Sequence, residues 1–198
     1  KGASALKQLA FFVGEEPYRR GVVDYFQRYA WKNATRAQFV EAIAGAAELD
    51  LDDWTNGWLQ TEGLSTIALS TKARDGNLTE AILEQQAYNT PRLSPHKTKV
   101  AAFRLDSSGA LRLDRSEVLS YRDEKTPVAW LSGEKVPDLI YPNYGDMDYG
   151  LFFLDTHSFE TALNHLADLE DPFTRQMVWG TLFSMVRHQK LKAPQMLD

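Results

Sequence analysis

The sequence predicts an α+β chain of three successive segments: helices, then an antiparallel β-sandwich, then a helical pair. Two changes in hydrophobic periodicity carry this prediction. Apolar residues recur at helical spacing up to residue 63, alternate at strand spacing over 64–155, and return to helical spacing over 156–198. We therefore expect segment boundaries near 63 and 155.

The first expected helix is already under way within a few residues of Lys1. Its apolar positions follow the spacing i, i+3, i+4, i+7 and are Leu6, Leu9, Ala10 and Val13. No initiating Met precedes them, and no apolar core of a signal peptide follows Lys1. A natural chain rarely begins within a helix. We therefore expect a piece of a longer protein, with a helix face that has lost its partner.

Two further helices are expected before residue 48. Pro17 suits the first turn of one of them. Thr35 and Gln38 have the spacing of a capping box and predict the start of the other. The apolar faces of the two helices consist of Val22, Tyr25, Phe26 and Tyr29, and of Phe39, Ala42, Ile43 and Ala46.

A short fourth helix should complete the first segment. Asp52 can cap it, and Gly63 can end it in a left-handed conformation. Trp54 and Trp58 are one helical turn apart and share a face, so we expect them to pack on the base of the sandwich.

The middle segment reads as about seven short strands separated by turns, with no helical crossover between them. This spacing is typical of an antiparallel sandwich. The expected strands are 66–71, 78–87, 99–105, 110–121, 127–130, 139–141 and 149–154.

The last segment reads as two helices, separated by Asp171 and Pro172. The first carries Phe159, Ala162, Leu163 and Leu166 on one face, and the second carries Trp179, Leu182, Phe183 and Val186.

Composition excludes several classes of function. The 198 residues include 22 Lys and Arg against 27 Asp and Glu, a net charge of −5, which gives no basic surface for nucleic acid or an anionic membrane. Without cysteine there are no disulfides, thiolate metal sites or cysteine nucleophiles. No apolar run approaches the ~20 residues that span a bilayer. We expect a cytoplasmic protein that binds neither nucleic acid nor membrane.

The histidines predict no metal site. No His-Glu-x-x-His motif is present. His157 and His165 are two helical turns apart, too far for one metal ion without other ligands, so both are expected on a helix surface. His96 is expected in a solvated loop. The fourth histidine is His188.

No catalytic or cofactor-binding residue is expected, since the chain has neither a Gly-x-Ser-x-Gly elbow nor a glycine-rich phosphate loop. Asp146 and Asp148 suggest a calcium loop, but the twelve-residue pattern is missing and a turn between strands explains both acids equally well. Four aromatic residues could line a carbohydrate- or peptide-binding face, although core packing also accounts for them: Trp130, Tyr141, Tyr144 and Tyr149.

Three stretches together resemble the M1 family of zinc aminopeptidases, the aminopeptidase N type. Residues 1–9, beginning Lys1-Gly2-Ala3, resemble the helix that follows the active-site region of that family. Residues 31–35 and 51–63 resemble the end of its catalytic domain. Residues 137–143, Asp155 and residues 166–179 resemble its last sandwich strands and the first helices of its C-terminal domain. The match runs in order along essentially the whole chain.

The resemblance implies a parent exopeptidase that removes N-terminal amino acids from peptides, with zinc as Lewis acid. It also implies that 1–63 is the helical end of a thermolysin-like catalytic domain and that 156–198 begins an α-helical domain. The family's zinc ligands and its catalytic Glu and Tyr lie upstream of Lys1 in this alignment. The chain itself is therefore expected to carry no catalytic or metal residue, no cofactor and no activity, and the rest of the parent should pack on its helices.

Two other readings stay open. The chain could be a free-standing binding module that recognises carbohydrate or protein through the aromatic residues of the sandwich, or a purely structural domain.

Overall fold

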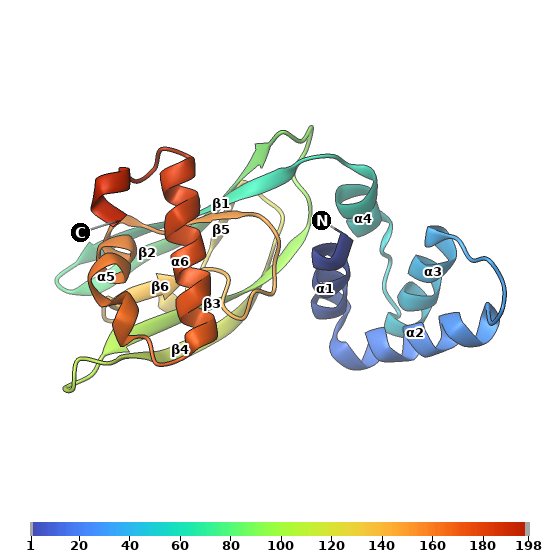
Figure 1. Cartoon of the computed structure of the whole chain (residues 1–198), viewed down its shortest axis with the longest axis horizontal. Coiled ribbons are helices and arrows are strands. Elements are labelled where there is room, and N and C mark those ends of the chain that lie inside the picture. The colour runs from blue at the N-terminus through green and yellow to red at the C-terminus, as the bar shows by residue number, and fades with distance from the viewer. Residues whose placement is uncertain (1, 197–198) are drawn as a thin grey trace.

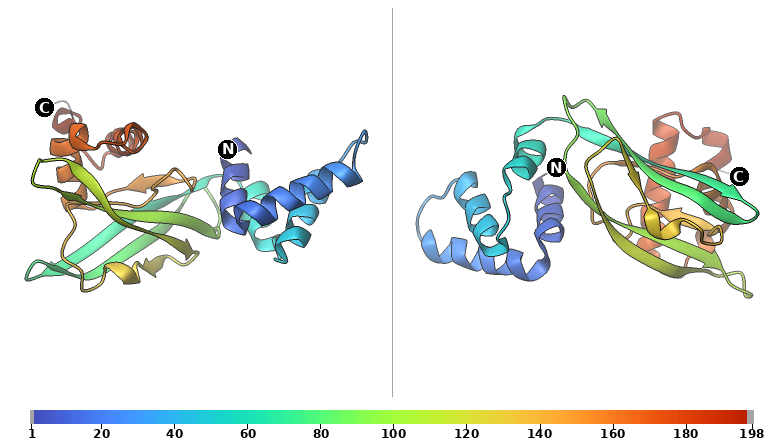
Figure 2. Two further views of the ribbon diagram at one scale, coloured as in Figure 1. Left: turned by 90° about the horizontal axis from the view of Figure 1, so that it is seen from below. Right: turned by 180° about the vertical axis from the view of Figure 1, so that it is seen from behind.

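In the computed structural model, which describes residues 2–196, a helical unit leads into two β-sheets that are followed by two helices (Figure 1). The helical unit, residues 2–60, lies at one end of the molecule. The final helices lie over the sheets. Views from two other sides show the helical unit at one end of the sheets, away from the final helices (Figure 2). Within residues 2–196 no helix is long and apolar enough to cross a bilayer.

The helical unit forms around a core of its own. It consists of α1 (Gly2–Val13), α2 (Glu15–Arg28), α3 (Arg36–Ala47), α4 (Asp52–Thr55) and a π-helical turn (Asn56–Gln60). The capping box predicted at the start of α3 is present, with the Thr35 side chain accepting from the Gln38 N–H. The buried core residues are Ala5, Leu9, Val13, Ile43, Leu51, Trp54 and Trp58.

The fourth helix differs from its prediction in two ways. The residue before it is Leu51, which has no capping side chain, and Asp50 rather than Asp52 accepts a helix N–H, that of Asp52, at 2.8 Å. The helix also widens into the π turn after one α-helical turn. Trp54 and Trp58 nevertheless stack, with ring centroids 5.9 Å apart.

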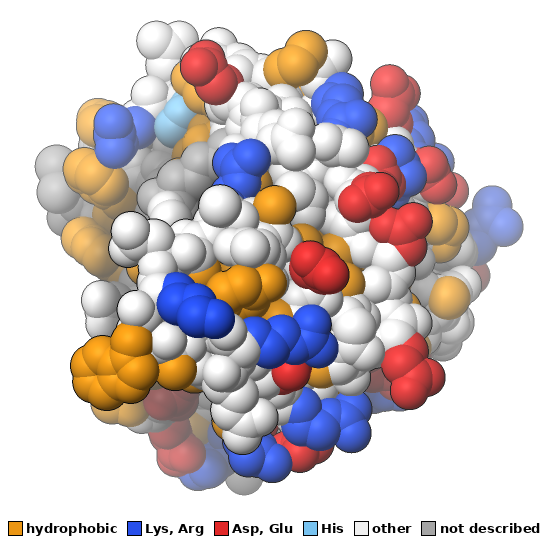
Figure 3. All heavy atoms as spheres, turned by 90° about the vertical axis from the view of Figure 1, so that its right-hand side faces the viewer, with side chains coloured by type: hydrophobic (Ala, Val, Ile, Leu, Met, Phe, Trp, Pro, Cys, Tyr) orange, Lys and Arg blue, Asp and Glu red, His pale blue; other side chains and the backbone are white. Residues whose placement is uncertain are grey.

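Helix α2 leaves much of its apolar face exposed. It approaches α3 at Gly21, where a Cβ atom would lie 2.7 Å from the Ile43 Cα. Gly21 is the buried residue of α2, whereas Phe26 is 66% exposed and Trp31, in the following turn, is fully exposed. Figure 3 looks onto this end of the molecule, where hydrophobic side chains lie open between charged ones. Phe26, which belongs to the apolar face predicted for this helix, is thus exposed within the described residues.

The strands form two sheets that pack face to face, here named the two-sheet unit (residues 64–153). The four-stranded sheet has the order β5 (Lys125–Pro127), β2 (Asn77–Tyr88), β1 (Leu64–Arg74) and β7 (Leu151–Phe153). The three-stranded sheet has the order β4 (Leu111–Tyr121), β3 (His96–Leu105) and β6 (Leu139–Tyr141). Alternate residues of both sheets meet in one core that includes Ile67, Leu69, Leu83, Val100, Ala102 and Ile140.

The expectation of antiparallel pairing throughout is wrong at one edge. Strand β7 runs parallel to β1, with Thr66 opposite Leu151 and Ala68 opposite Phe153. The chain crosses from β6 in one sheet to this edge of the other sheet, so no hairpin fixes the direction of β7. The strand expected at 127–130 is also shifted, since β5 ends at Pro127 and a 3-10 turn covers Ala129–Leu131.

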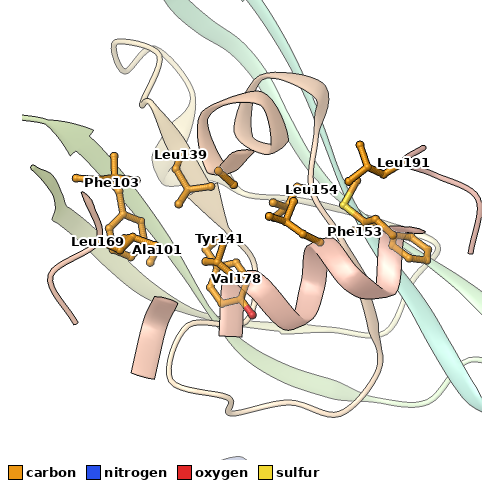
Figure 4. Packing of buried hydrophobic residues seen from close by; sticks show 13 residues of the cluster. Ala101, Phe103, Leu139, Tyr141, Phe153, Leu154, Leu169, Val178 and Leu191 are labelled. Atoms are coloured by element: carbon orange, nitrogen blue, oxygen red, sulfur yellow. The ribbon is translucent and has the colours of Figure 1, made fainter. Parts of the chain in front are cut away.

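The C-terminal helices share a core with the sheets. α5 (Thr156–His165) and α6 (Pro172–Arg187) begin at Asp155 and Asp171, whose side chains accept helix N–H groups. Strand β3 is buried on both faces, because Val100 and Ala102 point into the core between the sheets while Ala101 and Phe103 face these helices. Figure 4 shows Tyr141, Leu154 and Val178 meeting in this second core.

Candidate functional site

The most polar part of the interior is a cluster where the helical unit meets the two sheets. Its centre is Asp148, in the loop between β6 and β7, with His96 at the start of β3 and Tyr121 at the end of β4. Gln8 reaches it from α1. With Asn143, these side chains form what we name the Asp148 cluster.

The prediction that His96 lies in a solvated loop is wrong. His96 is the first residue of β3 and is only 3% exposed. Its ring stacks on Tyr121, with centroids 5.1 Å apart, and meets the edge of Trp58 at 4.9 Å. Strand alternation through Thr98 and Val100 extends back to His96 and places it on the inner face, which is why it is buried.

Four donors converge on the Asp148 side chain. Oδ1 accepts from Gln8 Nε2 at 3.2 Å and from the Tyr149 N–H at 2.7 Å. Oδ2 accepts from the Tyr121 hydroxyl at 2.7 Å. The His96 Nδ1 lies 2.9 and 3.0 Å from the two oxygens. The other partners of this carboxyl group are all donors, which assigns the proton of the imidazole to Nδ1.

The environment keeps Tyr121 in its donor form. Burial raises the pKa of the Tyr121 hydroxyl well above its usual value, and the negative charge of Asp148 raises it further. The phenol therefore retains its proton and its hydrogen bond throughout the physiological range.

Asn143 fixes the backbone that presents Asp148. Its Nδ2 donates to the Asp148 carbonyl oxygen at 3.0 Å, and its Oδ1 accepts from the Asp148 N–H at 2.9 Å. Both bonds are buried, and they join the two ends of residues 143–148 in the loop between β6 and β7. The carboxylate of Asp148 is thereby held in one direction.

The space beside the His96 ring is small. The cavity beside His96, lined by Trp58, Ser65, Ser94 and Tyr149 among others, has a volume of about 20 Å³. That is space for about one water molecule rather than for a peptide. The side chains of His96 and Asp148 are 3% and 0% exposed, and the contacts that they make here are hydrogen bonds and ring packing.

The donors of a zinc centre are not gathered either. Among residues 2–196 no group of three or more His, Asp or Glu side chains could hold a metal ion. His157 is exposed on α5, close to the Pro137 carbonyl oxygen, and His165 pairs with Asp168. His188 follows α6 and contacts the Ser184 carbonyl oxygen. The described residues therefore do not fit zinc.

The residues considered for a calcium loop or a binding face do not all lie together. Asp146 pairs with Lys7 of α1, with 2.8 Å between Nζ and Oδ2, while Asp148 is buried. Trp130 packs at the core between the sheets, Tyr144 at the core under α5 and α6, and Tyr149 at the core of the helical unit. Tyr141 and Tyr149 line one cavity of about 310 Å³, and Trp130 and Tyr144 do not line it. The four aromatic residues therefore do not form a single binding face.

Sequence comparison shows what this fold is related to. The chain is 34% identical over 201 residues to aminopeptidase N of Streptomyces lividans, covering 96% of this chain and 23% of that protein. The chain is homologous to the M1-type aminopeptidases. Leucyl aminopeptidase of Saccharolobus solfataricus is 28% identical over 89 residues, covering 45% of this chain and 11% of that protein. No family model matches the chain.

The solved structures agree at the level of fold. Aminopeptidase A of Legionella pneumophila, in complex with aspartic acid, superposes with a TM-score of 0.66 at 16% identity, covering 98% of this chain and 23% of that one. The chain thus spans less than a quarter of the length of these aminopeptidases.

Sequence reasoning missed the Asp148 cluster. The period-two alternation from Thr98 back to His96 was the one local signal that could have predicted the burial of this histidine. No local pattern connects Gln8 with Asp148, which are 140 positions apart.

Proposed function

We propose that this chain is a structural, non-catalytic part of a zinc-dependent aminopeptidase that removes N-terminal amino acids from peptides. The observation that carries the proposal is the 34% identity to an aminopeptidase N over 96% of the chain. An alignment of that extent includes the helical unit, both sheets and the final helices, so it is supported by more than one motif.

The catalytic groups of the proposed enzyme belong to the part of the protein outside this chain. Peptide hydrolysis of this type requires a metal-bound water, a base for its proton and a donor to the developing oxyanion. When bound, zinc would supply the Lewis acid. The separation of the histidines from one another and the burial of the Asp148 cluster favour a structural role for residues 2–196.

The rest of the parent protein is the proposed partner of the exposed apolar helix faces. On α6, Phe173, Trp179 and Phe183 are each about half exposed although the opposite face is buried. At the other end, Phe26 and Trp31 are open. Large apolar side chains grouped in this way mark surfaces that another part of a protein covers.

The proposed location of the enzyme is the cytoplasm, which fractionation of the producing cells would check.

The experiment compares two lengths of the same gene product. The 198-residue chain should leave aminoacyl-anilide substrates uncleaved even when zinc is added. A chain extended upstream through a His-Glu-x-x-His helix should cleave them, and a chelator should abolish the cleavage. Hydrolysis by the short chain alone would contradict the non-catalytic role. Absence of a zinc motif from the extended gene product would contradict the aminopeptidase.

A further inference from the structure

Many of the contacts that join the helical unit to the two-sheet unit are made by polar side chains. The core of the helical unit is separate from the cores of the sheets and receives only Tyr149 from beyond its own segment. The remaining links include Trp58 Nε1 to the Pro95 carbonyl oxygen at 2.8 Å and Lys97 Nζ to the Phe12 carbonyl oxygen at 3.0 Å. Polar interfaces between parts of one chain allow rotation unless specific bonds prevent it.

Asp148 provides such bonds because it contacts both units. From the two-sheet unit it accepts from His96 and Tyr121, and from the helical unit it accepts from Gln8. Gln8 itself donates to the Lys97 carbonyl oxygen at 2.7 Å as well, so one amide group is held by the loop and by β3 together.

Both partners of the Gln8–Asp148 contact are buried. Gln8 has an exposed fraction of 0%, and the Asp148 side chain has the same. Rotation of α1 would take the Gln8 amide away from both acceptors in a place that water does not reach, and an unpaired buried polar group is disfavoured. The direction of the Asp148 carboxylate therefore contributes to the orientation of α1, together with the Lys97–Phe12 and Lys7–Asp146 contacts.

We propose that Asp148 is a positioning residue, which helps to fix α1 at one orientation relative to the two-sheet unit. This inference rests on the proposed function, in that the fixed orientation serves turnover by the aminopeptidase. Misplacement of reacting groups by about 1 Å can lower a rate about 100-fold, so loss of the Gln8–Asp148 contact should act on kcat rather than on KM.

The test uses Gln8→Met and Asp148→Asn in the extended, active enzyme. Gln8→Met keeps the length of the side chain and removes the amide, whose Oε1 has no hydrogen-bond partner among residues 2–196, so this variant should fold. The matched control is Lys7→Met, because the Lys7–Asp146 ion pair joins the same helix to the same loop but is exposed to solvent.

We expect Gln8→Met and Asp148→Asn to lower kcat about tenfold or more, with KM changed less than threefold, and Lys7→Met to leave both unchanged. In the 198-residue chain, Gln8→Met should speed hydrogen exchange of the α1 amides about tenfold. Variants that lower only the Tm, with normal kcat, would overturn the positioning role. An inactive wild-type extended chain would refute the proposed function instead. In that case unchanged α1 exchange would overturn the inference, and faster exchange would support the fixation.

Discussion

On folding, the Asp148 carboxylate loses its bound water and gains four protein donors. Each donor should therefore contribute to the free energy of unfolding. Tyr121 supplies one of the shortest of these bonds, 2.7 Å, and lies within the two-sheet unit. Its removal leaves a buried carboxylate with one donor fewer, and the cost of an unmade bond to a buried group is about 1–3 kcal/mol.

Tyr121→Phe should lower the free energy of unfolding by about 1–3 kcal/mol at pH 7, measured by urea denaturation. The control is Tyr88→Phe, since Tyr88 is 40% exposed and should change stability by less than ~0.5 kcal/mol. Equal effects of the two substitutions would mean that the Tyr121 hydroxyl contributes nothing to the cluster.

The same pair of proteins should also respond differently to alkaline pH. The folded pKa of Tyr121 is raised above the unfolded value of 10.0 by burial, so above pH 10 only the unfolded state loses this proton. The unfolded state then binds fewer protons, and stability falls as pH rises. The advantage of wild type over Tyr121→Phe should therefore shrink by about 1.4 kcal/mol per pH unit above pH 10. A constant difference in unfolding free energy between pH 8 and 11 would contradict this.

At the scale of elements, the contact between α2 and α3 depends on one glycine. A Cβ at Gly21 would lie 2.7 Å from the Ile43 Cα and 3.0 Å from the Ala42 carbonyl oxygen, both backbone atoms that cannot turn away. Gly21→Ala should therefore separate the helices and destabilise the chain by about 1–3 kcal/mol, as overpacking does.

The neighbouring helix offers the matched control. Gly45 lies in α3, and a Cβ there would meet nothing within 4 Å. Gly45→Ala should stabilise the chain by about 0.5 kcal/mol, because alanine favours the helix. Thermal unfolding of both variants would decide the matter, and a Gly21→Ala protein with an unchanged Tm would show that the helices are not in this close contact.

Elements with a local signal could be predicted from the sequence. The capping box at Thr35 and the apolar run from Lys99 to Leu105 led to α3 and β3 within a few residues of their ends. Features that depend on distant partners could not. The parallel pairing of β7 is decided by the edge of β1, 85 residues earlier, and the hydrogen bond of His96 by Asp148, 52 positions later.

The same limit applies to the second helix. Its apolar pattern correctly predicted an amphipathic helix, but which of its apolar residues are buried depends on what covers them. Gly21 rather than Phe26 contacts α3, because a small residue allows the closest approach of two helices. A pattern in the sequence cannot distinguish a face that meets its own fold from one that meets another part of the protein.

For the molecule as a whole, the exposed aromatic residues give a prediction that compares two chain lengths. Trp31 is fully exposed in residues 2–196, so Trp31→Ala should change the stability of the 198-residue chain by less than ~0.5 kcal/mol. In the extended enzyme the same substitution should cost about 2 kcal/mol or more, the effect of removing a buried aromatic anchor from an interface. Equal Tm changes in the two proteins would mean that nothing covers this face.

The position of Asp148 in the sequence also determines when the molecule acquires its final form during synthesis. A ribosome adds about 5–20 residues per second, and domains near the N-terminus fold first. Gln8 precedes Asp148 by 140 positions, so about 7–28 s separate their translation at those rates. Strand β7, which closes the edge of β1, is translated only after Asp148. A nascent chain therefore contains α1 and β1 before it contains either Asp148 or the strand that closes the edge of β1.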